Sequence, residues 1–141
     1  MKTSIIYNSH SGITKAFAEE IGKFLEGQGV EQKVASIFKY DREFLQSADM
    51  VLLGCWTGGL MFFAQHPEKV WKKFAREMPE IKGKTVALFT TYKILTGSMF
   101  RKMEACLEGK IDHSPQIIKS KNRALTEKHK AQLMDLIKQI K

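Results

Sequence analysis

Two kinds of segment alternate along the chain according to the spacing of their hydrophobic residues. Short runs that are nearly continuous in apolar and β-branched residues predict buried strands, whereas apolar residues three or four positions apart predict amphipathic helices. The predicted strands span residues 2–8, 30–38, 49–56, 84–92 and 115–123. The predicted helices span residues 13–27, 41–48, 66–77, 97–109 and 126–140.

Local signals at the helix ends support this assignment. In the first predicted helix, Phe17, Ile21 and Leu25 recur every fourth position and form one apolar stripe, which stops near Gly27. The last predicted helix begins at Thr126, whose side chain is of a type that caps helix N-termini. Both helices are therefore expected to pack one apolar face against a sheet.

Strict alternation of strand and helix predicts the fold class. Five strands separated by helices indicate a doubly wound α/β domain with a parallel sheet, and no linker or repeat divides residues 1–141, so one domain is expected. In such sheets a ligand lies outside the carboxyl ends of the strands, where the winding direction reverses. The loops that matter most are therefore those that begin near Asn8, Gly54 and Thr90.

Length and composition limit the class of protein further. The chain has 141 residues, of which 43% are hydrophobic and 27% charged, as in ordinary globular domains. Cys55 and Cys106 are isolated from one another, which favours thiols in a reducing compartment over a secreted disulfide framework. No apolar run approaches the ~20 residues that span a bilayer, and polar residues follow the start too early for a signal peptide. A cytoplasmic protein without a membrane span is expected.

The charge of the chain favours anionic partners. Its 23 Lys and Arg residues against 15 Asp and Glu residues give a net charge of +8, which promotes association with acidic molecules. The basic residues are scattered over predicted helix surfaces and strand ends, so a solvated surface is expected and nucleic acid is not the expected partner.

The loop after the first strand, "YNSHSGITK" from Tyr7, is suited to hold a phosphate. Ser9, Ser11 and Thr14 offer hydroxyl groups, Gly12 lets the backbone approach a ligand closely, and the following helix directs free N–H groups at the same place. The loop lacks the patterns of nucleotide P-loops and dinucleotide folds, so neither ATP nor NAD is the expected ligand. The alternative is a capped helix with spare hydroxyls.

This loop resembles that of a known family. The run "SHSGIT" fits the Ser/Thr-x-Ser/Thr-Gly-x-Thr loop of flavodoxins, which follows the first strand and holds the phosphate of FMN. The resemblance extends over the chain and implies a three-layer, short-chain flavodoxin-like fold with strand order 2-1-3-4-5. It implies FMN as cofactor, with its phosphate bound by the loop residues Ser9, His10, Ser11, Gly12, Ile13 and Thr14.

Two further loops resemble the flavodoxin segments that bind the flavin ring. The resemblance assigns ring contacts after the third and fourth strands to Cys55, Trp56, Thr57, Gly58, Gly59, Thr90, Thr91 and Tyr92. A flat ring favours an aromatic or apolar face, which Trp56 and Tyr92 supply. Two departures from the family are the order Trp56-Thr57, where many flavodoxins carry Pro, and a fourth-strand loop without the usual Gly and Asp. The alternative for Trp56 is a core position.

No residue is assigned to catalysis or to a metal. The histidines are separated by spacings that do not suit a metal site, and each is expected at the surface or in a loop: His10, His66, His113 and His129. Cys55 has no evident base or resolving thiol nearby, so a small buried hydrophobe is expected there.

The resemblance implies an electron-transfer protein that passes one electron at a time between redox proteins. The net positive charge predicts acidic partners and makes the lower of the two FMN reduction potentials less negative, with Lys15 and Lys93 the nearest cations. Two alternatives stay open. One is an FMN-dependent oxidoreductase of the quinone or protoporphyrinogen type, and the other is a flavin-free flavodoxin-like interaction module.

Overall fold

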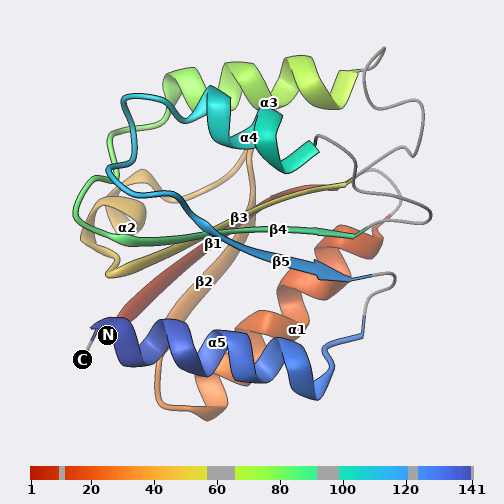
Figure 1. The fold of residues 1–141 in the computed structure, drawn as a ribbon, viewed down its shortest axis with the longest axis vertical. Coiled ribbons are helices and arrows are strands. Elements are labelled where there is room, and N and C mark those ends of the chain that lie inside the picture. Colours follow the sequence, from red (N-terminus) through yellow and green to blue (C-terminus); the bar gives the residue numbers. More distant parts are fainter. Residues whose placement is uncertain (10–11, 57–65, 92–98, 121–123, 141) are drawn as a thin grey trace.

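The computed structural model describes residues 1–9, 12–56, 66–91, 99–120 and 124–140. The strands are β1 (Lys2–Asn8), β2 (Glu31–Ser36), β3 (Met50–Trp56), β4 (Thr85–Thr91) and β5 (Gln116–Ser120). The helices are α1 (Ile13–Gly27), α2 (Arg42–Ser47), α3 (His66–Glu77), α4 (Met99–Cys106) and α5 (Glu127–Ile140). Figure 1 shows their order along the chain.

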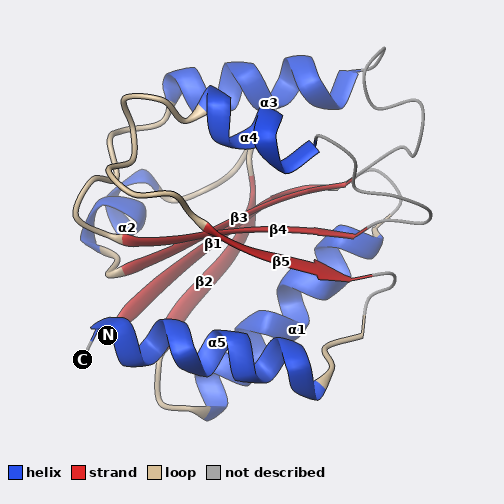
Figure 2. Cartoon of the chain, in the orientation of Figure 1, coloured by secondary structure: helices blue, strands red, loops and turns tan. Residues whose placement is uncertain are grey.

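The strands form one parallel sheet between two layers of helices (Figure 2). Its order is β2-β1-β3-β4-β5, and every neighbouring pair is parallel. This confirms the predicted doubly wound fold and strand order. Because all strands run the same way, their carboxyl ends meet at one edge, which places the predicted ligand loops together.

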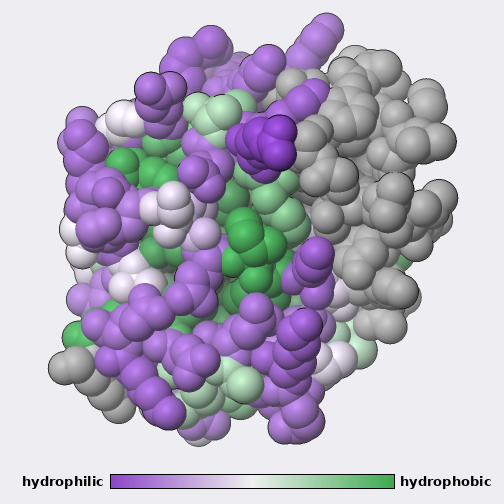
Figure 3. Space-filling model, viewed as in Figure 1, coloured by the Kyte–Doolittle hydropathy of each residue, from purple (hydrophilic) through white to green (hydrophobic). Residues whose placement is uncertain are grey.

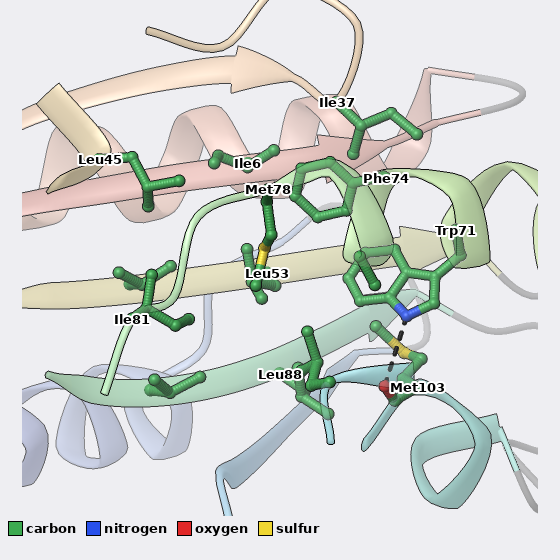
Figure 4. Close-up of a cluster of buried hydrophobic side chains, with 14 of the residues drawn as sticks. Ile6, Ile37, Leu45, Leu53, Trp71, Phe74, Met78, Ile81, Leu88 and Met103 are labelled. Atoms are coloured by element: carbon green, nitrogen blue, oxygen red, sulfur yellow. Dashed lines mark hydrogen bonds between the residues drawn. The ribbon is translucent and has the colours of Figure 1, made fainter. Parts of the chain in front are cut away.

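The core has two parts, one on each face of the sheet. Side chains of α1 and α5 pack on one face around Phe17, Ile21 and Leu133. On the other face, side chains of α2, α3 and α4 pack around Leu45, Trp71 and other residues drawn in Figure 4. Central strands covered on both faces become continuous apolar runs, which explains why β3 and β4 were recognisable in the sequence.

Trp71 links two helices within the second part of this core. Its side chain is 2% exposed, its ring lies 5.3 Å from that of Phe74, and its indole N–H donates to the Met103 carbonyl at 3.4 Å (Figure 4). A buried indole usually finds such an acceptor. Trp71 therefore fixes α3 against α4.

The second strand is shorter than its hydrophobic pattern predicts. The pattern continues to residue 38, whereas β2 ends at Ser36 because that residue forms a turn. The Ser36 hydroxyl accepts from the N–H of Phe38 at 3.2 Å, and its carbonyl accepts from Lys39 at 3.1 Å. Within the turn, Ile37 is buried, while Phe38 is exposed.

Asp41 caps the N-terminus of α2. Its carboxylate accepts from the Phe44 N–H at 3.0 Å and from the Lys33 ammonium at 2.8 Å. These hydrogen bonds, that from Lys33 foremost, hold the pKa of Asp41 below its usual range. A lowered pKa means that this contribution to stability is present at neutral pH and is lost as the pH falls through the lowered value.

Three basic side chains bind carbonyls at helix C-termini instead of standing free in solvent. Lys84 Nζ donates to the carbonyls of Gln46, at 2.7 Å, and Ala48, at the end of α2. Lys110 and Arg42 donate to carbonyls at the end of α3. Cations satisfy unpaired carbonyls and the negative end of the helix dipole there. Lys84 and Lys110 are half-buried, so these two of the expected surface cations are partly covered.

The prediction that His129 lies at the surface or in a loop is wrong, because it is buried at the start of α5. Its Nδ1 accepts from the N–H of Thr126 at 3.0 Å, and its Nε2 donates to the Lys119 carbonyl at 2.8 Å. The Thr126 hydroxyl in turn accepts from the His129 N–H at 3.4 Å. The two residues therefore form a reciprocal cap of the capping-box kind, with histidine where Glu or Gln is usual.

Replacing His129 with Ala is expected to lower the free energy of unfolding by about 2 to 3 kcal/mol, because the Thr126 N–H and the Lys119 carbonyl lose their partner and a buried ring is removed from the core. The ring also packs edge-on against Phe17 at 5.2 Å. Urea denaturation measures the change, with exposed Lys128→Ala as the control on the same helix turn. Equal stability of the two variants would show that the cap contributes nothing.

Candidate functional site

The sheet register places residues from three distant segments side by side at the carboxyl edge. Asn8 at the end of β1 pairs with Cys55 of β3, and Cys55 pairs with Thr90 of β4. All three are buried. The predicted loops after β1, β3 and β4 therefore leave the sheet from adjacent positions.

The described part of the first loop forms a turn that opens α1. Gly12 is the N-cap residue and has a φ of 89°, a left-handed conformation that favours glycine. Ser9 Oγ accepts from the N–H groups of Gly12 at 3.1 Å and Lys15 at 3.3 Å. Gathered N–H donors at the positive end of a helix are the groups that bind phosphate in proteins.

The surroundings of this turn suit an anion. The first turn of α1 contains no acidic residue, and the exposed Lys15 lies within it. A Cβ atom added at Gly12 would have no heavy atom within 4 Å among its described neighbours, so there is open space beside the backbone. The donors, the charge and the space all fit a phosphate group.

Thr14 occupies a different position from the other described residues of the loop. Its hydroxyl is buried and lies 2.6 Å from the hydroxyl of Thr91. This hydrogen bond joins the first turn of α1 to the end of β4. The structure thus places Thr14 as a link between two of the predicted loops.

Cys55 and Thr90 form a polar cluster on the opposite face of the sheet edge. The Thr90 hydroxyl donates to the Cys55 carbonyl, and Asn8 Nδ2 lies 3.8 Å from Cys55 Sγ. Cys55 is 0% exposed. These contacts hold the ends of β1, β3 and β4 together beneath the surface.

The structure brings together only part of the predicted set. Ser9, Gly12, Ile13, Thr14, Cys55, Thr90 and Thr91 lie at the carboxyl edge. The backbone of Trp56 ends β3 opposite Thr91. The remaining predicted residues lie outside the described part of the chain: His10, Ser11, Thr57, Gly58, Gly59 and Tyr92.

Gly54 holds a structural position next to the site. It pairs with Phe89 across β3 and β4, and a Cβ atom added to it would lie 2.1 Å from the Phe89 ring. The ring of Phe89 therefore covers the Gly54 backbone and packs against Phe17, with ring centroids 6.0 Å apart. Gly54 was visible in the sequence, but only the structure shows that the Phe89 ring leaves no room for a larger side chain at this position.

Two contacts at the site were not predicted from the sequence. One is that of Asn8 with Cys55, and the other is the hydrogen bond between Thr14 and Thr91. Asn8 was visible as a polar residue at the end of an apolar run, and only its position beside Cys55 gives it a partner. Thr14 and Thr91 were each predicted as site residues, in two different loops. Their pairing depends on how α1 is rotated against β4.

The described residues lack the features of two other kinds of site. They contain no group of three or more His, Cys, Asp or Glu side chains placed to hold a metal ion. None of the helices that the structure describes is both long and apolar enough to cross a bilayer.

Comparison with known proteins gives one family. The sequence matches the flavodoxin domain family over residues 4–128. A search of curated proteins found no match. The structure is similar to that of oxidised flavodoxin 2 from Bacillus cereus, with a TM-score of 0.73 and 20% identity, over 99% of this chain and 97% of that one.

Two other solved structures have the same fold. A flavodoxin from the domain Archaea aligns with a TM-score of 0.63 and 24% identity over 99% of both chains. The two-electron reduced flavodoxin of Megasphaera elsdenii aligns with a TM-score of 0.57 and 22% identity, over 84% of this chain and 83% of that one. At these identities the similarity establishes the arrangement of strands and helices.

Proposed function

Because the chain belongs to the flavodoxin domain family, we propose that it binds FMN at the carboxyl edge of its sheet and carries single electrons between redox proteins. Flavodoxins are FMN-binding electron-transfer proteins. The observation that carries the proposal for this chain is the turn at Gly12, where backbone N–H groups, open space and a positive helix end occur together.

The loop residues have separate roles in this proposal. The N–H groups that now donate to Ser9 Oγ are those best placed to donate to a phosphate, and the Ser9 hydroxyl can turn to donate as well. Thr14 is bonded to Thr91 and holds the turn in position. Ser11 and the backbone of His10 complete the phosphate contacts.

The ring contacts are proposed on the loops after β3 and β4. Trp56 and Tyr92 supply aromatic faces, and Thr57, Gly58 and Gly59 supply backbone groups for the polar edge of the ring. Cys55, Thr90 and Thr91 are buried, so they support the ends of the strands that carry these loops. Bound FMN supplies the electron-transfer chemistry, and the protein supplies its position and surroundings.

The partners proposed are acidic redox proteins, because the chain carries a net charge of +8. A cytoplasmic site of action is supported by the two cysteines of the chain, which lie far apart in the sequence and do not have the close spacing of a secreted disulfide framework.

The proposal is tested by comparing FMN with riboflavin, which has the same ring but no phosphate. We expect FMN to bind at least about 100-fold more tightly, since charge-assisted hydrogen bonds at the loop are lost with riboflavin. Quenching of flavin fluorescence in equilibrium titrations measures both affinities. Equal affinities would show that the loop does not hold the phosphate, and no binding of either flavin would refute the proposed function.

The charge of the chain should also affect the reduction potential of bound FMN. One net positive charge about 10 Å from the ring favours an added electron by roughly 1 to 2 kcal/mol, or tens of millivolts, at an effective dielectric constant of about 20. We therefore expect the lower FMN potential to be less negative than in acidic flavodoxins and to fall as salt screens the charge. Potentiometric titration at low and high ionic strength measures this, and a salt-independent, strongly negative potential would contradict it.

A further inference from the structure

The net positive charge is distributed unevenly between the two helical layers. α1 and α5 are balanced: their basic residues are Lys15, Lys23, Lys128, Lys130 and Lys138, and their acidic residues are Glu19, Glu20, Glu26, Glu127 and Asp135. α3 and α4 are not balanced: their basic residues are Lys69, Lys72, Lys73, Arg76, Arg101 and Lys102, and their acidic residues are Glu68, Glu77 and Glu104. The excess positive charge of the helices lies on the layer of α3 and α4.

Four of these cations form a stripe along α3. Lys69, Lys72, Lys73 and Arg76 are spaced by three and four positions, so they lie on one side of the helix, and all four are exposed. The opposite side of α3 is buried in the core through Trp71 and its neighbours. We call these four residues the α3 stripe, which is about 10 Å long at 1.5 Å per residue.

The α3 stripe faces solvent at the rim of the molecule. Figure 3 shows hydrophilic side chains along the top of the molecule, over α3. Some cations elsewhere have structural roles: Lys84 and Lys110 bind carbonyls at helix ends, and in the other layer Lys23 and Lys130 pair with Glu20 and Glu127. The α3 stripe is a part of the described surface on which four exposed cations lie close together, with Glu68 and Glu77 as the acidic residues of the same helix.

The α3 stripe begins near the candidate FMN site. β3 ends at the carboxyl edge, and α3 starts at His66 after the loop that follows β3. Figure 1 shows the start of α3 on the same side of the molecule as the ends of the strands and the start of α1. A partner bound along the stripe would thus reach the edge of the sheet where the phosphate loop lies.

We infer that the α3 stripe is the docking surface for an acidic redox protein, an inference that rests on the proposed function. Charge complementarity favours an acidic protein as the partner. Electron-transfer complexes have small interfaces, and their formation depends on electrostatic steering. A membrane is less suited, because the apolar face of α3 is buried in the core and has nothing to insert. Nucleic acid is less suited, because the α3 stripe has no exposed aromatic side chain for base stacking.

The test compares two variants with the same change in net charge. In the first, Lys69, Lys72, Lys73 and Arg76 are all replaced by Gln. In the matched control, Gln replaces four cations of the balanced layer, Lys23, Lys128, Lys130 and Lys138. The probe is a fluorescein-labelled decaglutamate peptide, whose anisotropy at low ionic strength gives a dissociation constant for each protein.

We expect the dissociation constant of the peptide to rise at least about tenfold in the α3 variant and less than about threefold in the control. Equal changes in both variants would overturn the docking surface. It would also be overturned if a 20-nucleotide single strand of DNA or phosphatidylglycerol vesicles bound the α3 stripe more tightly than the peptide.

Titration with FMN separates this inference from the proposed function. The α3 stripe belongs to the helical layer on the opposite face of the sheet from α1, which the phosphate loop opens, so both variants should bind FMN as the unmodified protein does. If the protein bound the peptide through α3 but did not bind FMN, the proposed function would fail while the acidic docking surface stood. If FMN bound normally and the α3 substitutions left the dissociation constant of the peptide unchanged, only the inferred docking surface would be refuted.

Discussion

Replacing Gly54 with Ala is expected to lower the free energy of unfolding by about 3 kcal/mol, at the upper end of the range for overpacked cores. The added Cβ would lie 2.1 and 2.2 Å from two atoms of the Phe89 ring. The ring cannot move away easily, because it is fully buried and packs against Phe17. Urea denaturation of the flavin-free protein measures the change.

Gly27→Ala is the matched control for this substitution. A Cβ added there has no atom within 4 Å, and Gly27 has no positive φ. Its stability should stay the same or rise by about 0.5 kcal/mol, because Ala restricts the unfolded chain. In the Phe89→Leu background, Gly54→Ala should cost less, as a double-mutant cycle would show. If Gly54→Ala lowered the free energy of unfolding by less than about 1 kcal/mol in the unmodified background, the sheet would have to shift enough to accommodate the methyl group.

Replacing Gly12 with Ala is expected to weaken FMN binding by about 10- to 100-fold, or roughly 1.4 to 2.7 kcal/mol. Gly12 has a φ of 89°, and an Ala side chain makes that conformation unfavourable by about 1 kcal/mol. Relief of the strain shifts the turn, so the N–H groups of Gly12 and Lys15 no longer point at one place. Flavin fluorescence titration measures the affinity.

Gly83→Ala is the control for this substitution, because it introduces similar backbone strain away from the phosphate loop. Gly83 has a φ of 84° and the same open space around its Cβ position, but it precedes β4 at the other edge of the sheet. Both variants should lose about 1 kcal/mol of stability, while only Gly12→Ala should lose FMN affinity. Equal FMN affinity in the two variants would show that Gly12 does not contribute to phosphate binding.

Much of the fold was predictable because its signals are local. The spacing of apolar residues predicted the helix at 13–27 and the helix at 66–77, and the structure confirms both. The prediction was less accurate at element ends. The second apolar run continues through Ile37 and Phe38, but the side chain of Ser36 forms a turn that ends the strand there.

The candidate site was predictable as three loops but not as a set of contacts. The pattern around Gly12 and the position of three strand ends are properties of the sequence together with the rules of parallel sheets. The hydrogen bond between Thr14 and Thr91 joins residues 77 positions apart. It depends on strand register and helix rotation, which no local pattern specifies.

The sequence by itself determined the kind and order of the elements, the phosphate-loop pattern and the net charge, because these depend on residue identity and on spacing between near neighbours. Only the tertiary structure decided that Gly54 makes room for Phe89, that His129 is buried, and that Lys84 binds carbonyls while the α3 stripe faces solvent. The physical reason is that close packing and the pairing of buried polar groups are settled between segments far apart in the chain.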